Sequence, residues 1–228
     1  MRIQNDEFMG WVHAGSLPKT MTHSHFNGTD DAVAFATTAA YEVLNKAVKH
    51  YSVVTQDKKL SPGERARSLK AGMDFMDDSV QRAKGVARRA DEFVQERATA
   101  AKEKFIRGTL TDEFALSLAV QLRMLGKDNS TSITTLVMSD PRFIQAINRV
   151  PPAVSGLSSE KVKSFTEAAI SQHAPDVQAL LNTAEASGKT FDRLNRVNTE
   201  LSLRIARDFD PEAFNQHNEI ANLLNPGA

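Results

Sequence analysis

Cysteine is absent from this chain of 228 residues. Its absence excludes disulfide bonds, thiolate metal sites and cysteine nucleophiles, and it fits a protein that works in a reducing compartment. An excess of charge of one sign is also missing, because 28 Lys and Arg residues balance 28 Asp and Glu residues. No global field therefore draws the chain to nucleic acid or to an anionic membrane, and any such binding has to be local.

Long apolar runs are missing as well. Asp6 and Glu7 lie where a secretory signal needs an apolar segment. No stretch approaches the roughly 18 apolar residues that span a bilayer. We therefore expect a soluble protein with no membrane span that is not secreted, and that is cytoplasmic or, if it comes from a bacteriophage, part of the virion.

Familiar catalytic signatures are the third absence. The sequence contains no GxSxG elbow, no HExxH pair and no dinucleotide-binding fingerprint, so nucleophilic, zinc-dependent and dinucleotide-dependent catalysis find no support in it. We predict that the protein is not an enzyme and needs no cofactor.

Three histidines near the N-terminus are weak candidates for metal ligands. His23 and His25 have a spacing that can place both imidazoles on one side of an extended segment, with His13 nearby in the sequence. A carboxylate such as Asp30 or Asp31 could complete a metal site. No second spaced pair supports this interpretation, so a polar loop is the simpler one, and a metal-dependent protein remains an alternative.

Helical periodicity is what the sequence does contain. Apolar residues recur at three- and four-residue steps from Asp30 or Asp31 to about Thr55. Ser61-Pro62-Gly63-Glu64 is then a capping box that begins a second helix, which has no stop signal before Gly108. This second helix would have about 46 residues and a length of roughly 69 Å. The short loop between the two helices predicts an antiparallel hairpin.

The second helix carries an apolar stripe with the a/d pattern of a left-handed coiled coil. Gly72 and Gly85 are positions at which it could bend or break. The preceding helix, about 25 residues and roughly 38 Å long, covers only about the first half of it. The second half needs a partner, either a later helix of the same chain or the same helix of another subunit. The interface predicted there consists of Ala87, Ala90, Val94, Ala98, Ala101 and Phe105.

Residues 1–29 show no sustained periodicity, and we expect them to form an extended arm. Apolar residues are scattered along this segment where an isolated disordered tail would be polar. The arm therefore needs a surface to lie on, which belongs either to this chain or to a neighbour. Trp11 and Phe26 complete the predicted interface.

The sequence as a whole predicts an all-α protein, an elongated helical bundle. After the arm come a long helical hairpin over residues 30–108 and a C-terminal region over residues 109–228, which we expect to fold with the hairpin as one domain. Asp140 opens one of its shorter helices, and Ser158 or Ser159 opens another. A second long helix from Pro175 to about Asp208 is expected to fold back along the hairpin.

Two classes of function fit this architecture. The favoured one is a structural assembly protein that forms a homo-oligomer or docks on other structural proteins, for example an internal, portal-associated or scaffolding-like component of a bacteriophage virion. The alternative is a nucleic-acid-binding or regulatory protein that uses a basic face on the second helix, composed of Arg82, Lys84, Arg88 and Arg89. An ordinary bundle whose helices pack within one chain fits the apolar stripe equally well.

Overall fold

A computed structural model describes residues 5–18, 31–128 and 130–224 of the chain. These residues form helices joined by short turns, and no strand occurs among them, so the predicted all-α class is confirmed. None of the helices in these ranges combines the length and the hydropathy that a bilayer crossing requires.

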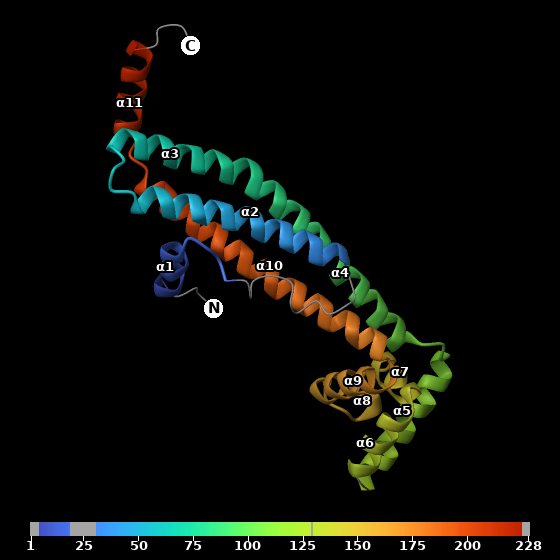
Figure 1. Ribbon diagram of the computed structural model, residues 1–228. Coiled ribbons are helices and arrows are strands. Elements are labelled where there is room, and N and C mark those ends of the chain that lie inside the picture. The colour runs from blue at the N-terminus through green and yellow to red at the C-terminus, as the bar shows by residue number, and fades with distance from the viewer. Residues whose placement is uncertain (1–4, 19–30, 129, 225–228) are drawn as a thin grey trace. The chain divides into compact units, whose positions relative to one another are not determined.

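The helices form two compact units, whose elements are labelled in Figure 1. The first unit contains Met1–Glu92 and Ala186–Ala228, and the second contains Phe93–Glu185. From the sequence, domain boundaries were expected after residues 29 and 108, where turn signals occur. Each boundary between the units falls inside a long helix, because such a helix is long enough to contribute side chains to two separate cores.

The long helix of the predicted hairpin is present. Three elements follow one another without a break, namely α3 (Pro62–Phe75), the π-helical turn η2 (Met76–Val80) and α4 (Gln81–Arg107). Together they form a helix of 46 residues. The capping box begins it as expected, because Ser61 Oγ accepts a hydrogen bond from Glu64 N at 3.3 Å and Glu64 Oε2 accepts one from Ser61 N at 2.9 Å.

Neither Gly72 nor Gly85 interrupts this helix. Gly72 is buried in α3, where a Cβ would lie 3.2 Å from Cδ2 of His50. The missing side chain therefore makes room for the imidazole. The irregularity occurs instead in η2, whose Met76 and Val80 both point into the core. A π-turn adds a residue to one turn, which is one way to keep an apolar stripe facing inward over a long helix.

The core of the first unit lies between α2 (Asp31–Gln56), α3, η2 and the later part of α10 (Pro175–Asp208). Leu44, Leu69, Val80, Leu194 and Leu201 are among its fully buried side chains. The expectation that the second long helix folds back along the hairpin is therefore confirmed within this unit. The last helix, α11 (Pro211–Leu224), packs against α3.

Residues 5–14 form a helix, α1 (Asn5–Ala14), instead of the expected extended arm. Phe8 and Val12 lie one turn apart on this helix, and both are buried in the core of the first unit. The segment is too short to show a periodicity in the sequence. Packing against α2, rather than intrinsic propensity, accounts for its helical structure.

The second unit has its own core, surrounded by α5 (Asp112–Asp128), α6 (Ser130–Ser139), α7 (Pro141–Arg149), α8 (Pro152–Ser155) and α9 (Ser159–His173). Asp140 is confirmed as an N-cap, because its side chain accepts a hydrogen bond from Arg142 N. Of the two serines that could open α9, Ser158 is the N-cap, because its side chain accepts a hydrogen bond from Lys161 N. The Ser- and Thr-rich α6 had no helical signal in the sequence. Its Ile133 and Val137, one turn apart, are buried.

Candidate interaction surfaces

The apolar stripe predicted as an interface is covered within the chain. Ala87, Val94 and Ala98 have exposed fractions of only 0%, 1% and 2%. Ala87 belongs to the core of the first unit, whereas Ala101 and Phe105 pack against a cluster in the second unit that contains Ile170, Ala174 and Val177. Ala90 is partly exposed.

The sequence allowed two partners for the stripe, and in the structure later helices of the same chain pack against it. In the second unit, Gln95 also donates a hydrogen bond from Nε2 to the Ala184 carbonyl of α10, at 2.7 Å. Packing inside the chain therefore already removes Ala87, Val94 and Ala98 from solvent, whereas the other three residues of the stripe stay partly exposed.

The described part of the N-terminal arm also binds its own chain. Tyr41 donates a hydrogen bond from its hydroxyl to the Leu17 carbonyl at 2.8 Å, and Asn45 Oδ1 accepts one from Leu17 N at 2.7 Å. Burial raises the pKa of the Tyr41 hydroxyl. Trp11 is partly buried and lies edge-on to Phe8, with ring centroids 6.2 Å apart. The predicted interface residue Phe26 lies outside the described residues.

A buried cation secures this arm. Arg204 of α10 lies over the Phe8 ring, with its Cζ atom 5.0 Å from the centroid, and donates from Nε to Glu200 Oε1 at 2.7 Å. Its Nη1 atom lies 3.0 Å from Met9 Sδ. The Arg204 side chain is only 10% exposed, so the guanidinium depends on these contacts to replace water.

The basic face on α4 is paired in part with acids of the same helix. Arg82 lies 3.7 Å from Asp78, and Arg88 lies 3.3 Å from Glu92, both in i,i+4 geometry. Lys84 is partly buried, and this desolvation lowers the pKa of its ammonium group. Arg89 is exposed. Two of the four predicted cations, Arg82 and Arg88, therefore already face a carboxylate of the same helix.

The histidine site predicted as a weak alternative receives no support from the described residues. His23 and His25 lie outside them. His13 is exposed in α1, and no group of three His, Cys, Asp or Glu residues with metal-binding geometry occurs in the described ranges.

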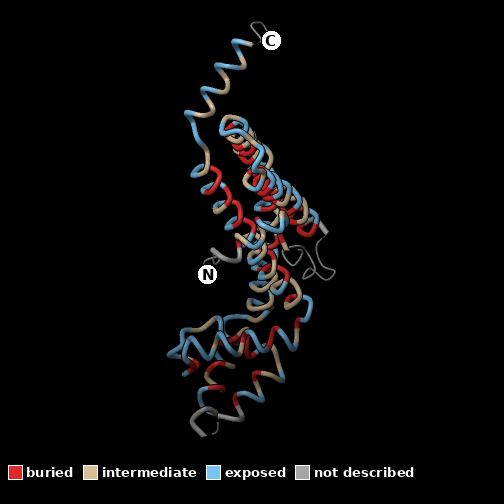
Figure 2. Tube along the Cα trace, turned by 60° about the vertical axis from the view of Figure 1, so that its left-hand side comes forward, coloured by how far each residue is buried: buried red, intermediate tan, exposed pale blue. Residues whose placement is uncertain are grey.

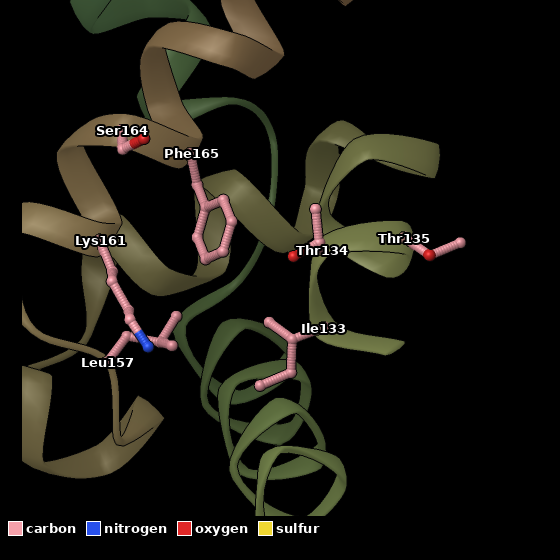
Figure 3. A pocket seen from close by; sticks show the side chains of 7 residues that line it. All are labelled: Ile133, Thr134, Thr135, Leu157, Lys161, Ser164 and Phe165. Carbon is pink, nitrogen blue, oxygen red and sulfur yellow. The ribbon is translucent and has the colours of Figure 1, made fainter. Parts of the chain in front are cut away.

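A groove of about 490 Å³ opens between α6 and α9 in the second unit (Figure 3). Ile133, Leu157 and Phe165 form its apolar floor, while Lys161 contributes an ammonium group beside it. Thr134 and Ser164 add hydroxyls at the rim. These groups could hold a small apolar molecule with one anionic group, but no pair of them has the arrangement of a nucleophile and a base.

A second hollow, of about 430 Å³, lies in the first unit where α10 ends and α3 begins. Arg65, Asp208 and Asp210 line it. Burial strongly raises the pKa of Tyr51, and the hydrogen bond that its hydroxyl donates to Asp208 raises it further. Asp210 caps α11, because its side chain accepts hydrogen bonds from the backbone N–H groups of residues 212 and 213. These carboxylates therefore already have structural roles.

Large apolar side chains nevertheless remain exposed in both units. In the first unit they are Phe35 and Val53 of α2, Val86 of α4, Leu203 of α10, and Ile220 and Leu223 of α11. In the second unit they are Phe93 of α4, and Phe114, Leu116 and Met124 of α5. None of these residues belongs to the predicted interface. On α5, apolar residues occur almost all around the helix, so the sequence gives no signal of which ones are exposed.

Half of these exposed side chains lie on two helices, α5 and α11. In α11 no residue from Pro211 to Leu223 is buried, and Figure 2 shows the helix that leads to the C-terminus without any buried residue. Ile220 and Leu223 there are 58% and 80% exposed. Scattered apolar residues on a surface are ordinary, whereas apolar residues that gather on one helix suggest a contact with another protein.

Comparison with known proteins adds no assignment. The chain matches no family model, no curated protein and no solved structure.

Proposed function

We propose that this protein is a non-enzymatic assembly protein, which associates with further copies of itself and thereby builds or joins a larger structure. The observation that supports this proposal is the exposure of large apolar side chains on the outer faces of α5 and α11. Met124 is 66% exposed and Leu223 80% exposed. Contact with another protein would remove these side chains from water at a gain of roughly 25 cal/mol for each Å² of apolar surface.

The covered stripe on α4 changes the surface through which association is proposed. Ala87, Val94 and Ala98 pack inside one chain, so association needs neither unfolding of the bundle nor exchange of a long helix. Each copy can fold completely and then associate through side chains that are already exposed. A component of a virion is one setting that such a protein would suit.

The mass of the chain in solution tests the proposal. Light scattering across a hundredfold range of concentration should give a mass that rises from 25.1 kDa towards a multiple of it. Raising the salt concentration should not abolish the association, because burial of apolar surface rather than surface charge drives it. A mass of 25.1 kDa at every concentration would contradict self-association.

A further inference from the structure

The outer face of α5 carries an apolar ridge that no helix of its own unit covers. The ridge consists of Leu116, Val120 and Met124, which we call the α5 ridge. Leu116 is 48% exposed, Met124 is 66% exposed and Val120 between them is partly exposed. Steps of four residues advance only about 40° around a helix, so the three side chains form one continuous row.

The opposite side of α5 is what holds the helix in its unit. Ala115, Ala119 and Leu122 are buried there, against α6, α7 and α8. Arg123 also donates a hydrogen bond from Nη1 to the Ala153 carbonyl at 2.8 Å. The helix is therefore fixed from behind, and its ridge is presented to solvent as a rigid, preformed surface.

The pattern along this face is symmetric about Val120. Glu113 lies seven residues before Val120, and the sequence has Lys127 seven residues after it. With Leu116 and Met124 between, the steps are three, four, four and three residues, and they read the same from either end. Glu113 and Lys127 carry opposite charges. A contact between two identical surfaces related by a two-fold axis requires this kind of self-complementarity, whereas a contact with an unrelated protein does not.

We propose that α5 of a second copy of this chain packs antiparallel on the α5 ridge, with Val120 of both copies at the two-fold axis. Leu116 of one copy then lies beside Met124 of the other, and Glu113 of each copy lies opposite Lys127 of its partner. This inference rests on the proposed function, because it specifies the surface through which self-association occurs.

One helix from each copy forms a small contact. Stable complexes bury roughly 1,200–2,000 Å² in total, and this ridge offers only three apolar side chains per copy. We therefore expect a dimer that dissociates on dilution. Ridge-into-groove packing puts the helix axes about 8–10 Å apart.

The absence of cysteine makes a sharp test of the register possible. A Val120→Cys variant carries one thiol per chain, located at the proposed axis. Two helices at that separation place the facing Cα atoms about 4–5 Å apart, which suits a disulfide. In the matched control Ser117→Cys, the exposed thiols of two copies are about 9 Å apart along the helices and cannot reach each other.

Mild oxidation of the folded variants should therefore convert most of Val120→Cys into a disulfide-linked dimer. Ser117→Cys should give at least tenfold less of this dimer. Charge reversal provides an independent readout without oxidation. Glu113→Lys should weaken the dimer, and Glu113→Lys combined with Lys127→Glu should restore it, because the two positions face each other in the antiparallel pair.

The outcomes separate this inference from the proposed function. If the wild-type chain associates but Val120→Cys and Ser117→Cys cross-link equally, or if the double charge reversal restores nothing, the α5 contact is wrong while self-association stands. If the wild-type chain stays monomeric at every concentration, both proposals fail. Circular dichroism of each variant shows that it remains helical, so a misfolded variant cannot be mistaken for a dissociated dimer.

Discussion

The packing of α1 against its own chain leads to a prediction with a built-in control. Phe8 is completely buried beneath Arg204, whereas Phe35 in the same unit is 76% exposed. Replacing either residue by alanine removes the same atoms. The two variants therefore differ only in the environment from which the ring is removed.

The expected magnitudes follow from that difference. Truncation of a buried phenylalanine costs about 3–5 kcal/mol, including the cavity that it leaves. Because α1 is a single short helix that packs against α2 and can open locally, the cost should be close to the lower limit, about 3 kcal/mol. Phe35→Ala should change the free energy of unfolding by no more than about 0.5 kcal/mol.

Urea unfolding followed by circular dichroism measures both values, at a concentration at which the chain is monomeric. The fluorescence of Trp11, the only tryptophan, provides a local probe because its ring lies 6.2 Å from that of Phe8. Phe8→Ala should shift this emission towards that of a solvated indole. Equal, small losses of stability in the two variants, with unchanged fluorescence, would refute the docking of α1.

Three further substitutions test the local structure through the same unfolding measurement. Ser61→Ala should cost about 1 kcal/mol by removing the N-cap. The hydrogen bonds from Ser61 hold the pKa of the Glu64 carboxyl group below its usual value. The stability that they contribute is therefore present above the pKa of an unfolded glutamate and is lost as the pH falls through the lowered pKa. This loss on acidification should be smaller in Ser61→Ala. Gly108→Ala should destabilise the protein by about 1–3 kcal/mol, because Gly108 has φ +51° and a Cβ would overlap the Gln145 side-chain amide. Gly85→Ala should instead stabilise it by about 0.5–1 kcal/mol, because that glycine lies inside a helix and a Cβ there would meet only Nη1 of Arg89, at an ordinary contact distance of 4.0 Å. A loss of stability there would contradict the uninterrupted helix.

The long helices could be predicted because their signals are local. The capping box at Ser61 and the absence of a stop signal before Gly108 predicted the 46-residue helix, and the same reasoning found the N-cap Asp140. Periodicity also identified the inward faces, since Val94 and Leu201 are buried as their positions required.

The missed features depend on contacts between distant residues. Residues 5–14 are too few to establish a period, and they fold onto α2 through Phe8 and Val12. The Ser- and Thr-rich α6 likewise packs on its core through a few side chains, among them Ile133, Leu136 and Val137. A period shows which face of a helix is buried, but it does not show whether the covering helix belongs to the same chain.

This last difficulty applies to the predicted interface. Val94 and Ala98 had the right pattern for a subunit contact, but later helices of the chain already cover them. The exposed face of α5 could not be predicted from the sequence for a different reason. Apolar residues occur almost all around that helix, so its sequence alone did not distinguish Leu116 and Met124 on the surface from Ala119 and Leu122 in the core.

Amide hydrogen exchange at two protein concentrations tests most directly which surface each copy offers to the next. At the higher concentration, we predict slower exchange in peptides from residues 112–128 and unchanged exchange in those from residues 81–107. Added protection confined to residues 81–107, or rates that do not depend on concentration anywhere in the chain, would contradict the account.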